Sequence, residues 1–163
     1  MAAAAIVQPV FAQTSAAPAT TVETAKNNWS VNCAAGETAD APLTCQMVQN
    51  VVVVESNQRL LTVVIRPEKE SPNHTLTLAL PHGVDFLKGV EVSIDDKEAF
   101  NLPVQTSNPQ GAFSNLPISD ALLASLKAGT SMEIIFHAVS GQSYTLPISL
   151  IGFSSAYGKL SSG

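Results

Sequence analysis

Charged residues are scarce in this chain. Its 163 residues include 8 Lys and Arg and 13 Asp and Glu, which together make up 13% of the sequence, whereas about 25% is usual for a soluble domain. A nucleic-acid-binding surface needs clustered basic residues, and the net charge here is −5. Hydrophobic residues reach 45%, so the composition is not that of a disordered chain. We expect one folded domain that has no nucleic-acid partner.

Long apolar runs and catalytic motifs are also missing. The body of the chain has no run of about 20 apolar residues, so we expect no transmembrane span. It contains no glycine-rich phosphate loop, G-x-S-x-G elbow, H-E-x-x-H motif or EF-hand loop. His74, His82 and His137 could each join a distant Ser and Asp, but any chain of this size offers such triples by chance. We therefore expect no enzyme, no catalytic, cofactor-binding or metal-binding residues, and no cofactor.

Cysteine is limited to Cys33 and Cys45. Two cysteines are too few for a metal site, and no histidine lies at a ligand-like spacing to them. The chain has no C-x-x-C redox motif. In an exported protein an even number of cysteines favours pairing over two free thiols. We predict a structural disulfide between them.

The N-terminal segment is typical of export. Residues 1–22 carry no charge, and Val10-Phe11-Ala12 places small residues where a signal peptidase would cleave. We interpret residues 1–12 as the remnant of a signal peptide and residues 13–27, rich in Ala, Thr and Pro, as a disordered linker. The folded domain then covers residues 28–157, and residues 158–163 form a tail. The alternative is an Ala-rich leader with no targeting role.

The remaining pattern indicates β-strands. Apolar residues alternate with period 2 in Thr75–Leu80 and Val90–Ile94. Six further segments are candidate strands: Trp29–Cys33, Thr44–Val54, Leu60–Arg66, Ala112–Ile118, Met132–Val139 and Tyr144–Ile151. Turn residues separate them, and Asp95-Asp96 is expected to be such a turn rather than a catalytic carboxylate pair. Short strands at this spacing predict an all-β fold, an antiparallel β-sandwich or a partly open barrel.

One short helix is expected near residues 119–128. Ser119 is a suitable N-cap, Asp120 lies in the first turn, and Lys127 precedes Gly129 at the other end. The apolar stripe of this helix is expected to pack on the core rather than to bind a partner. Because charges are few, Ser, Thr, Asn and Gln must supply most of the polar surface of the strands. The run Val51–Val54 is expected to be buried, although on a free edge it would invite strand addition.

Several segments in order resemble the invasion-associated locus B (IalB) family of exported bacterial proteins. The similar segments are Asn28–Cys33, Cys45–Gln49, Leu80–Gly83, Gly89–Asp96, Leu102–Gln105, Ile118–Gly129 and Thr145–Phe153. The resemblance covers about residues 28–157. The family usually has a second cysteine pair, and the corresponding positions here are Ser107 and Ala112. The Asn108–Gly111 turn between them is therefore expected to be more mobile than in relatives.

The resemblance implies an exported, non-enzymatic protein of the periplasm or cell surface. Such a protein would contribute to host-cell invasion or virulence by binding a protein partner of the host or of the bacterial envelope. The alternative function is a general envelope module that binds a small ligand or assists assembly. That alternative predicts an apolar cleft between the sheets or a free edge strand. The sequence indicates no oligomeric state.

Overall fold

The computed structural model describes residues 22–24, 29–35, 43–54, 56–68, 73–95 and 97–161. The expected signal-peptide remnant 1–12 and most of the expected linker 13–27 lie outside the described residues, as does Asp96. Neither helix in the described part of the chain has the length and apolar character needed to cross a membrane.

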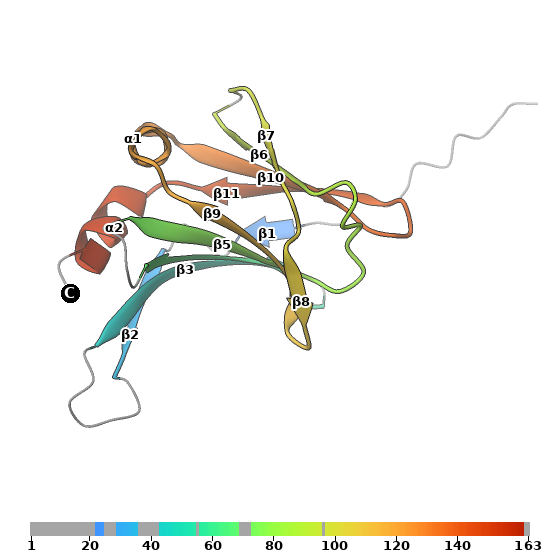
Figure 1. Cartoon of the computed structure of the whole chain (residues 1–163), viewed down its shortest axis with the longest axis horizontal. Coiled ribbons are helices and arrows are strands. Elements are labelled where there is room, and N and C mark those ends of the chain that lie inside the picture. Colours follow the sequence, from blue (N-terminus) through green and yellow to red (C-terminus); the bar gives the residue numbers. More distant parts are fainter. Residues whose placement is uncertain are drawn as a thin grey trace, which may run out of the picture.

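Two antiparallel sheets pack face to face (Figure 1). The larger sheet has the order β1-β3-β4-β5-β9-β8, with β2 also paired to β3, and the smaller has the order β11-β10-β6-β7. The strands of the larger sheet are β1 (Val22–Thr24), β2 (Ser30–Ala34), β3 (Thr44–Val53), β4 (Arg59–Pro67), β5 (His74–Leu80), β8 (Thr106–Asn108) and β9 (Gly111–Pro117). Those of the smaller sheet are β6 (Val90–Ile94), β7 (Phe100–Leu102), β10 (Ser131–His137) and β11 (Ser143–Ser149). The predicted all-β antiparallel sandwich is confirmed, and it is not a closed barrel.

The core lies between the facing sides of the sheets. Alternate residues of each strand point inward, as the period-2 pattern requires. The larger sheet contributes Met47, Leu61, Val63, Ile65, Leu76, Leu78 and Leu80, and the smaller sheet contributes Val90, Val92, Met132, Ile134, Phe136, Leu146 and Ile148. Each of these side chains is at most 2% exposed.

Two helices close the same end of the sandwich (Figure 1). The predicted helix is α1 (Asp120–Ala128), and the hydroxyl of Ser119 accepts a hydrogen bond from the Leu122 N–H as its N-cap. The sequence did not predict α2 (Phe153–Ser161). Residues 158–161, expected to belong to the tail, are the last part of this helix, and Leu160 is buried. Phe153, Ala156, Tyr157 and Leu160 form the apolar stripe that packs on the core.

Three short strands were also not predicted from the sequence. β1 lies within the expected linker and pairs with the last residues of β3, where Val22 is opposite Val53. The run Val51–Val54 is buried only in part: Val51 is fully buried, and Val54 is 49% exposed in the turn after β3. β7 and β8 each add three residues to an edge. Strands of this length give no period to detect, and their position depends on the longer strands beside them.

Candidate functional site

Four of the six large apolar residues that are exposed in the described part of the chain lie in the loops at the end of the sandwich opposite the helices. We call this region the loop end; it comprises the β3–β4 turn, the β5–β6 loop and the β10–β11 turn (Figure 1). Leu87 is 98% exposed and Val139 is 75% exposed, and Val54 and Phe86 are about half exposed. Single exposed apolar residues are ordinary, but a group of them at one place marks an interaction surface.

The loop end is held in place by hydrogen bonds. The Asp85 N–H donates to the His137 carbonyl at 2.7 Å, and the Val139 N–H donates to the Gly83 carbonyl at 2.8 Å. The Leu87 N–H donates to Asp85 Oδ1 at 3.0 Å. These bonds join two loops that are far apart in the sequence. Phe86 and Leu87 are therefore presented on a fixed turn, so little conformational entropy would be lost on binding.

A cleft of about 290 Å³ opens between the sheets at the loop end. Its walls combine apolar groups with a polar rim. They include Val53, Leu60, Val84, Phe136 and Tyr144, with Gln58 and His82. The rings of Phe136 and Tyr144 stack with 5.1 Å between centroids. The volume is at the lower end of the range of small-ligand pockets, about 300–1,000 Å³.

Within the described residues, the three histidines lie without the Ser and Asp partners of a hydrolytic triad. His82 Nε2 is 3.1 Å from the Pro109 carbonyl oxygen, and His74 Nδ1 is 2.7 Å from the Tyr157 hydroxyl. In the described ranges, none of the three histidines has a Ser hydroxyl or an Asp carboxylate within hydrogen-bond distance. A search of the same residues finds no group of three or more His, Cys, Asp and Glu that could hold a metal.

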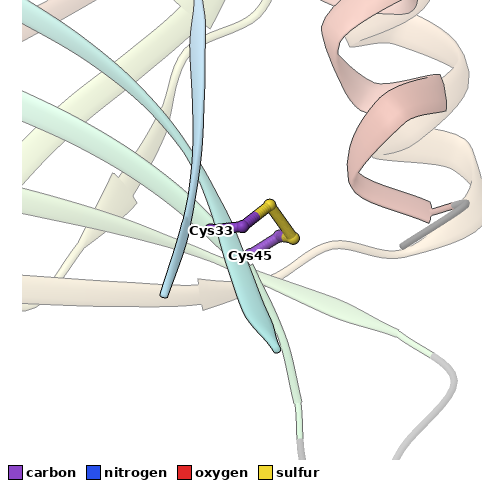
Figure 2. Close-up of a disulfide and its surroundings, with 2 residues drawn as sticks. All are labelled: Cys33 and Cys45. Carbon is purple, nitrogen blue, oxygen red and sulfur yellow. A yellow bond between two sulfur atoms is a disulfide. The ribbon is translucent and has the colours of Figure 1, made fainter. Parts of the chain in front are cut away.

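The predicted disulfide joins Cys33 and Cys45 (Figure 2). The two residues face each other directly across β2 and β3, with 3.9 Å between their Cα atoms. The bond fastens the short edge strand β2 to the long strand β3. Trp29, just before β2, adds a second attachment, since its indole Nε1–H donates to the Ser149 carbonyl at 2.9 Å. Both contacts stabilise the edge of the larger sheet.

Asp95 has a structural role in the turn after β6. Its Oδ1 accepts hydrogen bonds from the Thr130 hydroxyl at 2.8 Å and from the Ser131 N–H at 2.9 Å. Hydrogen bonds from the Ser131 N–H, the Thr130 hydroxyl and the Thr130 N–H hold the pKa of this carboxyl below its usual value. The carboxylate thus fixes the start of β10.

His74 and Tyr157 join β5 to α2. Burial lowers the pKa of the His74 imidazole, and burial followed by the charge of Asp120 raises the pKa of the Tyr157 hydroxyl. Lys127 Nζ lies 5.0 Å from the centre of the Tyr157 ring. Each shift favours the neutral form of its group, so the pair is a structural contact that holds α2 on the sheet.

The sequence pattern did not lead to a prediction of a site at the loop end. Phe86 and Leu87 form an apolar pair between Gly83 and Gly89, two glycines with positive φ angles of 81° and 70°. An apolar pair inside a loop bounded by such glycines is the sequence signal that could have indicated exposed apolar side chains here. Val139 was assigned to a strand, but β10 ends at His137 and Val139 lies in the following turn.

Comparison with known proteins identifies the family. The profile described as invasion associated locus B (IalB) protein matches residues 29–161. The chain belongs to the IalB family. The match includes both helices and every strand except β1.

Similar proteins agree with this assignment. An invasion protein B homologue of Brucella abortus strain 2308 is 30% identical over 151 residues, which cover 92% of this chain and 85% of the relative. A homologue from Brucella abortus biovar 1, strain 9-941, gives the same values. The crystal structure of invasion associated protein B from Bartonella henselae superposes with a TM-score of 0.69 at 20% identity, covering 81% of this chain and 89% of that one. At that identity the structural match supports the IalB fold.

The positions of the second cysteine pair expected for the IalB family face each other here. Ser107 of β8 is opposite Ala112 of β9, the same direct cross-strand arrangement as Cys33 and Cys45. The turn between the two strands is held by side chains instead. Arg59 Nη2 donates to the Gln110 carbonyl at 2.8 Å, and the Gln110 N–H donates to Asn108 Oδ1 at 2.8 Å. That this turn is more mobile here than in relatives remains a prediction.

Proposed function

We propose that this IalB-family protein is an exported, non-enzymatic component of the bacterial periplasm or cell surface that binds another protein through its loop end. The family name and the uncharged N-terminal segment support export and a contribution to host-cell invasion. The observation that carries the binding proposal is Leu87, an apolar side chain that is 98% exposed on a hydrogen-bonded turn.

The partner is a protein with an apolar hollow that accepts Phe86 and Leu87. A membrane surface would be the other apolar target, but anionic bilayers attract clusters of basic residues. The chain has a net charge of −5, and Lys88 is the basic residue adjoining Leu87 in the sequence. The apolar pair Phe86 and Leu87, with polar residues around it, fits a protein interface, where a few central side chains supply most of the affinity.

Capture by matched variants tests this proposal. The mature protein is immobilised and exposed to extracts of the bacterial envelope and of host membranes. Leu87→Asp should weaken retention of a specific partner about 30-fold, since truncated central residues cost about 2 kcal/mol or more. Ser155→Asp is the control because Ser155 is exposed on α2, at the opposite end of the sandwich. Equal retention by both variants would contradict the proposal, and so would binding to protein-free anionic vesicles.

Protease treatment of intact bacteria distinguishes a location on the cell surface from one in the periplasm. A protein that contacts the host should be cleaved when intact bacteria are treated with an external protease. Complete protection in intact cells, with cleavage after the outer membrane is permeabilised, would place the protein in the periplasm and argue against direct host contact.

A small-ligand function is the second candidate, and the cleft of about 290 Å³ beside the loop end favours it. Its apolar walls and the Phe136–Tyr144 stack suit a small amphipathic molecule. Tyr144→Ala would then abolish binding of such a molecule without affecting partner capture. An unliganded cleft after extraction and mass spectrometry of native protein would argue against this function.

A further inference from the structure

Two hollows lie on the outer face of the larger sheet, away from the loop end. One hollow of about 360 Å³ is lined by Arg66 and Glu68 of the β4 end together with residues of β5, β8 and β9. A second hollow of about 270 Å³ lies over β2 and β3 and also includes Arg66. Arg66 therefore lines both hollows. We call them together the sheet groove.

The sheet groove faces away from the core. Thr75 and Thr77 alternate with the core residues Leu76 and Leu78 on β5, so they point to the opposite side. In Figure 1 neither helix covers this side of the sheet, and β2 and the β8–β9 hairpin extend on it at its two margins. The face is nevertheless recessed, because Thr77 is only 6% exposed.

Hydrogen bonds fix the polar side chains of the groove. The Thr77 hydroxyl donates to Asn115 Oδ1 at 2.7 Å. Asn115 Nδ2 donates to Gln105 Oε1 at 2.8 Å, and Gln105 Nε2 donates to the Asn115 carbonyl at 3.2 Å. The Thr75 hydroxyl donates to Glu68 Oε2 at 3.4 Å. This network orients hydroxyl and amide groups in advance of binding, which lowers the entropy lost with a ligand.

The chemistry of the lining selects the class of ligand. Hydroxyl and amide groups act as both donors and acceptors, as the hydroxyls of a sugar do. Arg66 and Glu68 carry opposite charges, so the groove favours a neutral ligand. The half-buried ring of Phe113 adds an apolar surface for the C–H face of a sugar ring. A nucleic acid would need several basic groups.

An extended polypeptide fits less well. Such a segment binds a sheet by pairing with the backbone of an edge strand. The strands under the hollow at Thr75 and Phe113 are interior strands, and β4, β5 and β9 are each paired on both sides. The backbone groups of these three strands are therefore already used, and the edge strands β8 and β2 at the margins of the groove are only three and five residues long.

We propose that the sheet groove binds a neutral oligosaccharide, with Arg66 at its centre and Thr75, Asn115 and Phe113 along its length. This site is separate from the loop end and does not depend on the protein-binding function proposed above. The protein would then hold a glycan on one face and a protein partner at one end.

Nuclear magnetic resonance titration of the mature protein tests the proposal. The probes are tetrasaccharides of glucose, of galactose and of N-acetylglucosamine, added up to about 10 mM, enough to saturate a site with a millimolar Kd. At least one should shift the backbone amides of Thr75, Thr77 and Asn115 while leaving that of Leu87 unchanged. Arg66→Ala should weaken the binding about tenfold, the usual effect of losing one charged hydrogen bond.

Two controls make the result specific. Lys97→Ala removes the same charge from the turn after β6 and should leave the affinity unchanged. Leu87→Asp should also bind the sugar normally, whereas Arg66→Ala should keep the protein partner. The proposal is overturned if none of the three tetrasaccharides shifts the groove amides. It is equally overturned if a Ser- and Thr-rich peptide shifts them and the sugars do not.

Discussion

Replacing Phe153 by Ala should destabilise the fold strongly, because this side chain attaches α2 to the sandwich. Phe153 is 0% exposed. Its ring meets the edge of Trp29 at 5.3 Å between centroids and stacks on Tyr157 at 5.8 Å. Removing a buried Phe costs about 3–5 kcal/mol, which combines the lost transfer free energy with the cavity left behind. The aromatic pairs place this site in the upper part of that range.

Urea denaturation measures this effect. For a slope of about 2 kcal/mol per molar urea, a loss of 3–5 kcal/mol lowers the midpoint by about 1.5–2.5 M. Fluorescence of the single Trp29 reports the packing beside α2, and far-ultraviolet circular dichroism reports the sheets. Phe153→Leu removes the aromatic pairs but leaves a smaller cavity, so it should cost less than Phe153→Ala and remain measurable if the Ala variant is too unstable.

Phe86→Ala is the matched control. It removes the same ring from a side chain that is 45% exposed at the loop end, and surface changes of this kind stay near 0.5 kcal/mol. If Phe153→Ala lowers the midpoint no more than Phe86→Ala does, then α2 does not contribute to the core. Residues 153–161 would in that case act as a tail, and packing of α2 on the core would not stabilise the fold.

Three other perturbations probe different contacts by urea denaturation. Hydrogen bonds from Ser131 and Thr130 hold the pKa of Asp95 in the folded protein below its usual value. This carboxylate therefore stabilises the fold above the usual Asp pKa of about 3.9, and the contribution is lost as the pH falls through the lower folded pKa. Asp95→Asn should therefore weaken the loss of stability in acid, and an unchanged acid profile would count against the turn contacts. Gly111→Ala should cost about 1–3 kcal/mol, because φ is 142° and a Cβ would overlap the Leu80 carbonyl oxygen; Gly141→Ala, with open space around the added Cβ, should cost less. Replacing both Cys33 and Cys45 by Ser should cost about 2–3 kcal/mol for a separation of 12 residues. That variant should no longer respond to reductant, and a wild type equally indifferent to reductant would contradict the stabilising role of the disulfide.

The strands that the sequence predicted are those with a period to read. The pattern at Val90–Ile94 matches β6 at both ends, and Thr75–Leu80 differs from β5 by one residue. β6 buries one face, so its alternation follows directly from burial. β5 is buried on both faces from Leu76 to Leu80, and its alternation follows from the leucines that point into the core. The three-residue strands β1, β7 and β8 have no such alternation. Their pairing is determined by contacts with distant strands.

The second helix was overlooked although its signal was present. Phe153, Ala156, Tyr157 and Leu160 have the i, i+3, i+4, i+7 spacing of an amphipathic helix. Gly158 and the serines around it have weak helix propensity, and the IalB resemblance quoted from the sequence ended near residue 157. Packing of the aromatic stripe against Trp29 and His74 overrides that weak propensity.

Uncharged polar residues take the place of charged ones on one face of the structure. The expectation that Ser, Thr, Asn and Gln replace charged residues on the strands agrees with the outer face of the larger sheet. There Thr62 donates to Asn50 at 2.6 Å and Thr77 donates to Asn115 at 2.7 Å. Sequence alternation indicates that such a face exists. The recess in it, and the position of Arg66 beside both hollows, depend on which distant strands pair and cannot be read from the pattern.

Photo-cross-linking from position 87 in living cells tests directly whether the loop end binds a protein. A benzophenone-bearing residue replaces Leu87 in one strain and the exposed Ser155 of α2 in another. If the loop end is the protein-binding surface, irradiation should give a discrete covalent adduct with one protein from position 87 and none from position 155. Absence of an adduct at position 87, or the same adduct from both positions, would show that the loop end is not that surface.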